Sequence, residues 1–218
     1  VCWQSALTKV TKMHVPTKLM ALGDIATIRS GFTFREKIDE LTSGGNARVA
    51  QIKDVRNEWE TTQSSLLKAN QLPMIQWEGK DKAFVDSGTV LLPSRGSKGG
   101  YFRASCLILD SPAELPVVVS SQFLVLTPKP EVLPEFLCWS LNRPDIQYLL
   151  SEGMSQGSSI VMLNTANAAA IQLKVPSLAT QQKIVRLNEL WEREQQLTQE
   201  LLRNRESMLQ GMYQHLLM

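Results

Sequence analysis

The segment Val90–Arg103, VLLPSRGSKGGYFR, carries the side chains best suited to binding an anionic ligand. It contains basic residues and an aromatic residue but no acidic one. Its glycines let the backbone approach a phosphate or a groove wall, and an arginine can pair with guanine through two hydrogen bonds. The composition favours a nucleic-acid contact, with an ordinary solvated hairpin loop as the alternative. The candidate contact residues here are Arg95, Ser97, Lys98, Tyr101 and Arg103.

Two further polar segments are candidates for the same surface. The run 153–159, GMSQGSS, has no charge, but glutamine and serine side chains can hydrogen-bond to phosphates or base edges. A simple connecting loop is the alternative. Around residues 53–59, basic side chains precede Trp59, and a strand end capped by the tryptophan is the favoured interpretation there. The candidate contact residues in these segments are Lys53, Arg56, Gln156, Ser158 and Ser159.

Patterns that would indicate catalysis are weak. Asp54 with Glu78 and Lys80 has the acid and acid-x-Lys form of a metal-dependent nuclease, but so short a pattern arises by chance. The sequence has no GxxxxGK[ST] phosphate loop and no Asn-Pro-Pro-aromatic turn of an amino-methyltransferase. We therefore expect a binding protein that needs no cofactor and no metal, and retain a small nuclease using these three residues as the alternative.

Composition excludes several classes of protein. The 218 residues are 43% hydrophobic and carry a formal net charge of +2, so any nucleic-acid surface must be local. No apolar run approaches the length of about 20 residues that spans a bilayer, and no signal peptide is evident. Three cysteines in no CxxC spacing and two histidines make a disulfide scaffold or a zinc module improbable. A cytoplasmic protein is expected.

Hydrophobic patterning predicts an α+β domain with a mixed sheet. The spacing predicts a short helix and then a strand within 22–34, and further strands over 48–55, 89–92, 117–126 and 171–175. Helices are expected from Pro134 and over 145–150. The domain organisation predicted is a lead-in segment over 1–18, the domain over 19–176 and a long helix over 177–218.

The long C-terminal helix is predicted by a change of composition. From Thr180 onward there is no proline, and one glycine among residues rich in Gln, Glu, Arg and Leu. Its apolar positions form a stripe interrupted at Glu194 and at Asn204 and Arg205. Because this stripe is longer than one domain can cover, we expect a coiled-coil contact, most simply a homodimer. The stripe comprises Ile184, Leu187, Leu190, Trp191, Leu197, Leu201, Met208, Met212 and Leu216.

The chain contains LGDIATIRSGFTF at 22–34, DSGTVLLPSRGSKGG at 86–100 and IQLKVPSLATQQKIV at 171–185. In this order the three stretches resemble the DNA-specificity subunit of type I restriction-modification systems. LGDIATIRSGFTF at 22–34 is similar to the start of a target-recognition domain of that family. DSGTVLLPSRGSKGG at 86–100 is similar to its strand ending in an Arg-Gly loop. The glycine-serine loop from Gln156, followed by IQLKVPSLATQQKIV, is similar to its terminal strand and the start of its helix, with Pro176, Leu178, Gln181 and Ile184 in place.

The resemblance implies a non-enzymatic role in a larger complex. Members of the family usually hold two recognition domains separated by long helices, whereas this chain has the residues for one domain and one helix. The implied function is recognition of half of a split site in double-stranded DNA. The implied partners are methyltransferase and restriction subunits. A regulator that binds a restriction complex through its helix is a further alternative.

Overall fold

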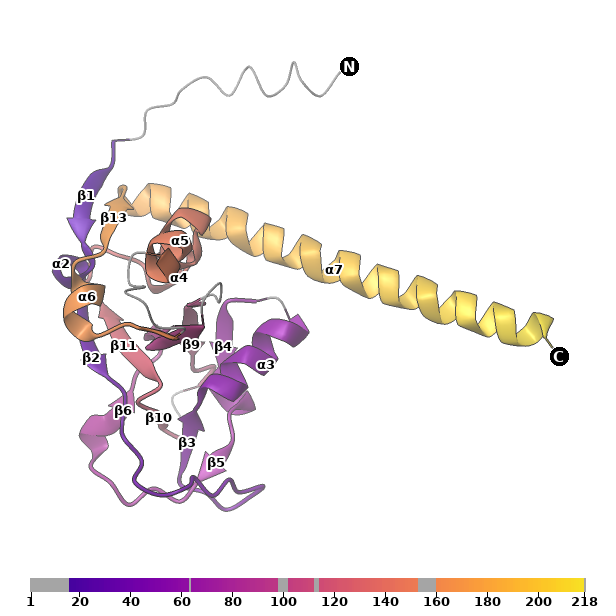
Figure 1. The fold of residues 1–218 in the computed structure, drawn as a ribbon, viewed down its shortest axis with the longest axis horizontal. Helices are drawn as coiled ribbons and strands as arrows, with labels where there is room; N and C mark the ends of the chain where they lie inside the picture. The colour runs from indigo at the N-terminus through magenta and orange to yellow at the C-terminus, as the bar shows by residue number, and fades with distance from the viewer. Residues whose placement is uncertain (1–15, 63, 98–101, 112–113, 153–159, 218) are drawn as a thin grey trace.

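The computed structural model describes residues 16–62, 64–97, 102–111, 114–152 and 160–217. A mixed α/β domain built from residues 18–175 is followed by one long helix, α7 (Leu178–Leu216), which projects beyond it (Figure 1). The predicted class, an α+β domain with mixed sheets and a long C-terminal helix, is confirmed.

A five-stranded sheet forms the centre of the domain. Its strands run in the order β2 (Ala26–Ser30), β11 (Phe123–Pro128), β7 (Val90–Pro93), β9 (Ser105–Ile108) and β4 (Leu66–Lys68). Only β4 and β9 are parallel; the other neighbours are antiparallel. Such strands are apolar without interruption because the sheet is covered on both faces.

Alternate residues of these strands enter two different cores. On one face, Val90, Leu92 and Leu126 pack with α4 (Pro134–Asn142). On the other, Leu91 and Val125 pack against α3 (Ile52–Thr62). Because successive side chains of a strand point to opposite faces, a single apolar run provides the packing surface for both α3 and α4.

A smaller sheet differs from the sequence-based prediction in two segments, 117–126 and 48–55. Its order is β5 (Met74–Ile75), β3 (Ala47–Ala50), β10 (Val117–Val119) and β6 (Phe84–Val85). The single strand predicted over 117–126 is wrong, because a turn at Ser120–Gln122 divides it into β10 and β11, which belong to different sheets.

The strand predicted over 48–55 is also wrong beyond Ala50, where helix α3 follows after one residue. The Asp54 carboxylate accepts the backbone N–H of Gln51 at 3.0 Å, which satisfies a donor at the start of the helix. Ile52, Val55 and Trp59 then recur at helical spacing and face the core. The Asp54 cap and the helical spacing of the apolar residues therefore outweighed the alternating polarity that had predicted a strand.

The two ends of the domain meet at a two-stranded ribbon. Strand β1 (Lys18–Ala21) pairs antiparallel with β13 (Gln172–Val175), which leads into α7. The short helices α2 (Leu22–Ile25) and α6 (Thr165–Ala169) lie beside this ribbon (Figure 1). The remaining helix, α5 (Pro144–Glu152), follows α4 directly, and short 3-10 turns span Ala69–Gln71 and Asp81–Ala83.

Helix α7 is attached to the domain at two levels. At its start the buried Gln181 amide accepts the Leu133 N–H at 2.9 Å and donates to the carbonyls of Glu131 and Pro176, both at 3.0 Å. Three turns later the Glu192 carboxylate accepts both serine hydroxyls of Ser64 and Ser65, at 3.2 and 2.8 Å. Two separated attachments fix the direction of the helix as well as its position.

Beyond residue 195 the large apolar side chains of α7 are all exposed, from Leu197, with 47% of its surface accessible, to Leu216. The helix has 39 residues and is therefore about 58 Å long at 1.5 Å per residue. Within the described residues, no helix is both long and apolar enough to span a membrane.

Candidate nucleic-acid interface

A two-stranded ribbon connects the two loops that the sequence analysis singled out. Strand β8 (Arg95–Ser97) pairs antiparallel with β12 (Ile160–Met162), and Ser97 lies opposite Ile160. The segment that leaves β8 and the segment that precedes β12 therefore attach at the same end of the ribbon. Lys98, Tyr101, Gln156, Ser158 and Ser159 belong to these two segments and lie outside the described residues.

Gly96 allows the ribbon to lie directly against the domain core. A Cβ atom at this position would be 2.5 Å from Cε2 of the Phe102 ring, which is closer than any carbon contact allows. Phe102 is fully buried, whereas Arg95, the neighbour of Gly96 on β8, is exposed. The tight approach at Gly96 therefore holds the basic strand at the surface.

Two side-chain amides fix the backbone on either side of Arg103. Gln147 of α5 accepts the Phe102 N–H at 2.8 Å and donates to the Phe102 carbonyl at 2.9 Å. Asn142 of α4 bonds in the same two-way manner to Ala104, with both distances 2.8 Å. These amides act as a neighbouring strand would, so that Phe102 and Ala104 point inward and Arg103 points outward.

The exposed Arg103 guanidinium lies over the Trp59 ring of α3, with 4.5 Å between its central carbon and the ring centroid. This contact brings a residue of the basic segment to the helix that carries Lys53 and Arg56, both exposed. A cation held on an aromatic face has less side-chain freedom than one in open solvent. The predicted capping role of Trp59 at a strand end is wrong, since Trp59 lies on a helix.

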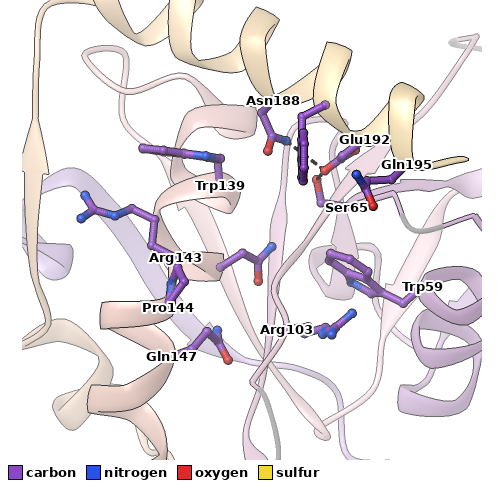
Figure 2. Close-up of a pocket in the computed structure, with 12 residues that line it drawn as sticks. Trp59, Ser65, Arg103, Trp139, Arg143, Pro144, Gln147, Asn188, Glu192 and Gln195 are labelled. Atoms are coloured by element: carbon purple, nitrogen blue, oxygen red, sulfur yellow. Dashed lines mark hydrogen bonds between the residues drawn. The ribbon is translucent and has the colours of Figure 1, made fainter. Parts of the chain in front are cut away.

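Arg103 and Trp59 form one wall of a cleft of about 740 Å³ beneath α7 (Figure 2). Trp139 and Arg143 form the opposite wall, with the Arg143 guanidinium 5.6 Å from the Trp139 ring centroid and its Nη2 atom 2.8 Å from the Asp145 carboxylate. The α7 residues Asn188, Trp191, Glu192 and Gln195 close the cleft above. Tryptophan and amide groups converge here from α3, α4, α5 and α7, and the two arginines come from the segment before β9 and from the junction of α4 and α5.

Lys53 is neutralised within the chain. Its ammonium contacts the Glu40 carboxylate, and this pairing lowers the pKa of Glu40 and raises the pKa of Lys53. Any ligand that recruits Lys53 must compete with Glu40. Arg56 forms no ion pair with another described residue, which makes it the more available charge of α3.

The residues proposed for a nuclease are not assembled. Asp54 caps α3, and burial raises the pKa of its carboxyl. Glu78 lines a separate cavity with residues 32–41, and Asp54 does not line it. Within the described part of the chain, no group of three or more His, Cys, Asp or Glu side chains lies close enough to hold a metal ion.

Three residues important to this site escaped the sequence analysis: Asn142, Gln147 and Trp139. The available signal was an amide within an otherwise apolar helix, as at Gln147 between Ile146 and Leu150. Cys106 and Cys138 are free and buried; burial raises the pKa of the Cys106 thiol to about 12 and that of Cys138 well above its ordinary value. Both thiols are packing groups rather than nucleophiles.

Comparison with known proteins identifies similar chains. The model of a sequence family described as "Type I restriction modification DNA specificity domain" matches residues 15–203. No curated protein matches the sequence.

Two solved structures share the fold. One, from work on complex assembly and conformational transition of the type I R-M system, is 14% identical with a TM-score of 0.62, and the match covers 96% of this chain and 48% of that one. The other, the HsdS subunit from Thermoanaerobacter tengcongensis, is 16% identical with a TM-score of 0.53, covering 89% and 43%. The chain thus spans about half the length of the solved chains that it matches.

Proposed function

The chain belongs to the family of type I restriction-modification DNA specificity domains, and from that premise we propose that it recognises a specific sequence in duplex DNA. It does so without catalysing a reaction itself. The observation that carries the proposal is the β8–β12 pairing, which brings Ser97, just before residues 98–101, opposite Ile160, just after residues 153–159, on a ribbon bearing the exposed Arg95. Loops of this composition can follow a groove and reach base edges, while the arginines contact phosphates or guanine.

Arg103 supplies a second, better defined contact point. The Gln147 and Asn142 amides hold its backbone, and the Trp59 ring orients its side chain at the surface. A charge held in one place loses little conformational freedom on binding, which favours a directional contact over a diffuse one. The surface of this protein that meets DNA is therefore proposed to include the β8–β12 ribbon, Arg103 and the exposed Arg56.

Replacing Arg103 by alanine is expected to weaken binding by about 1 to 3 kcal/mol if Arg103 reads a base, or to lower the salt slope by about one if it contacts a phosphate. The probe is the duplex that the full chain recovers from a randomised library, titrated at several salt concentrations. Lys174→Ala is the matched control, because it removes the same charge from an exposed position of β13. Equal affinities of the two variants would contradict the assignment of Arg103.

The exposed apolar stripe of α7 suggests how two recognition domains are brought together. We propose that two copies associate through the exposed stripe of α7, so that two domains read the two halves of a split site with two-fold symmetry. Leu187, Leu190 and Trp191 are 70%, 53% and 57% exposed, an apolar surface that the chain's own domain leaves open. Ile184 is an exception among the predicted stripe residues, because it packs against the domain's own core. The methyltransferase and restriction subunits are the proposed further partners, acting in the cytoplasm.

The full chain is expected to sediment as a dimer at tens of micromolar, because burying this stripe stabilises the paired helices. The matched control replaces Leu187, Leu197 and Leu201 by glutamine, which removes apolar surface from exposed positions and leaves Gln181 and Glu192 in place. This variant is expected to be monomeric with an unchanged circular dichroism spectrum. A parent chain that stays monomeric at that concentration would rule out self-association and leave the helix to a different subunit.

A further inference from the structure

Two opposite charges interrupt the apolar stripe of α7 without any partner on the helix itself. Glu194 lies between Leu190, Trp191 and Leu197, and no residue three or four positions from it is basic. Arg205 lies among Leu201, Leu202, Met208 and Leu209, and no residue at those spacings is acidic. Both side chains are exposed, and neither forms an ion pair with another described residue. A charge within an apolar stripe weakens helix pairing unless an opposite charge meets it.

An antiparallel second copy of α7 can supply both missing charges at once. When Glu194 faces the partner's Arg205, two-fold symmetry places Arg205 against the partner's Glu194, so the same pair of opposite charges forms twice in one dimer. The charges alone define this alignment. If it is correct, it must also bring apolar residues of the two helices opposite one another. That requirement is an independent check.

The apolar residues match in this alignment. Leu187 faces the partner's Met212. Trp191, which lines the cleft at the edge of this face and is 57% exposed, is level with the partner's Met208. Leu190 faces the partner's Leu209, and Leu197 faces the partner's Leu202. At the edge of the stripe, Arg193 lies opposite the partner's Glu206, which adds another pair of opposite charges.

Neighbouring alignments are worse. A shift of one heptad in one direction places Glu194 against the partner's Met212 and Leu201 against the partner's Arg205. The shift in the other direction places Leu187 against the partner's Arg205 and moves the partner's Met212 beside Thr180, next to the buried Gln181. Both shifts bury unpaired charges in an apolar seam, which is costly.

The face required for this pairing is open. Gln181 turns toward the domain, and Asn188, Trp191 and Glu192 line its cleft, whereas Leu187 and Leu190 lie on a different side of the helix and are exposed. The partner's helix can therefore run back along residues 183–195 without displacing the attachments to Ser64 and Ser65.

We propose that Glu194 and Arg205 are the register-setting residues of an antiparallel α7 pair formed by two copies of this chain. The inference rests on the proposed self-association and specifies its geometry. It fixes the two-fold axis between Gln199 and Glu200, and hence the separation of the two recognition domains. A polar pair within an apolar seam is a well-attested way of selecting one register among several.

A charge-reversal cycle in the full chain tests this proposal by sedimentation equilibrium. Glu194→Arg and Arg205→Glu each place like charges opposite one another twice per dimer, and each is expected to weaken association about tenfold or more. The double variant restores opposite charges and is expected to return to within about threefold of the parent. Glu200→Arg, outside the stripe, is the matched control for the change in charge and should differ from the parent by about twofold at most.

The outcomes separate this inference from the proposals on which it rests. A double variant that stays as weak as the single ones overturns the register, while the dimer of the parent chain stands. A parent that does not dimerise overturns both self-association and register, and the duplex titration with Arg103→Ala still decides DNA recognition on its own. Single variants as strong as the Glu200→Arg control would also overturn the register.

Discussion

Replacing Gln181 by leucine is expected to lower the free energy of unfolding by about 3 to 6 kcal/mol. The amide of this fully buried side chain bonds to the Leu133 N–H and to the carbonyls of Glu131 and Pro176. Leucine fills a similar volume but leaves all three backbone groups without a partner, and each unsatisfied buried group costs about 1 to 3 kcal/mol. This effect is large because one side chain joins the start of α7 to the turn before α4.

The measurement is urea denaturation of the parent and of two variants. Gln182→Leu is the matched control, since Gln182 is the next residue of the same helix and is exposed. We expect it to change stability by less than about 0.5 kcal/mol. If Gln181→Leu unfolds at the same urea concentration as Gln182→Leu, the amide does not anchor the helix.

Replacing Gln147 by leucine is expected to reduce both stability and DNA binding. The Gln147 side chain is 5% exposed and bonds to the Phe102 N–H, the Phe102 carbonyl and the Leu141 carbonyl. Leucine at this position leaves these three backbone groups without a partner, as at Gln181, so we expect the free energy of unfolding to fall by about 3 to 6 kcal/mol. Because the bonds to Phe102 hold the backbone beside Arg103, we also expect affinity for the selected duplex to fall at least as far as in Arg103→Ala.

Two measurements on one pair of variants separate these effects. Tyr148→Leu is the control, since Tyr148 follows Gln147 on α5 and is 64% exposed. Binding is titrated at a temperature where circular dichroism reports both variants as folded, so that lost affinity reflects the placement of Arg103. A Gln147→Leu protein that is destabilised but binds as tightly as Tyr148→Leu would confine Gln147 to a structural role.

Several features of this protein follow from its sequence alone because they depend on neighbours along the chain. Helix α7 is one, since a long run without proline and with a recurring apolar stripe has no other regular structure available. The helix that starts at Pro134 and the strand before Pro93 are others, because proline sets the boundary in each. The order of these local signals also sufficed for the family resemblance, which the match over residues 15–203 confirms.

The candidate site depended on contacts between residues far apart in the sequence. Nothing near Ser97 indicates that its partner strand begins at Ile160, so the pairing of the two strands that border the polar segments required the structure. The same holds for Arg103 on Trp59 and for the two amides that hold its backbone. The hydrogen-bonding capacity of a glutamine or asparagine can be read from its type, but its partner is decided by the folded chain.

Residues 48–55 and 117–126 mark the boundary between these two kinds of information. Alternating polarity predicted a strand in each, yet a cap by Asp54 and a turn at Ser120–Gln122 divided them differently. An apolar run indicates that its side chains will be buried. Long-range packing then determines which sheet or helix buries them. The sequence by itself determined which segments of this protein are buried and that α7 is one helix. Only the tertiary structure decided which surfaces meet, because that choice minimises the free energy of the whole chain rather than of any segment.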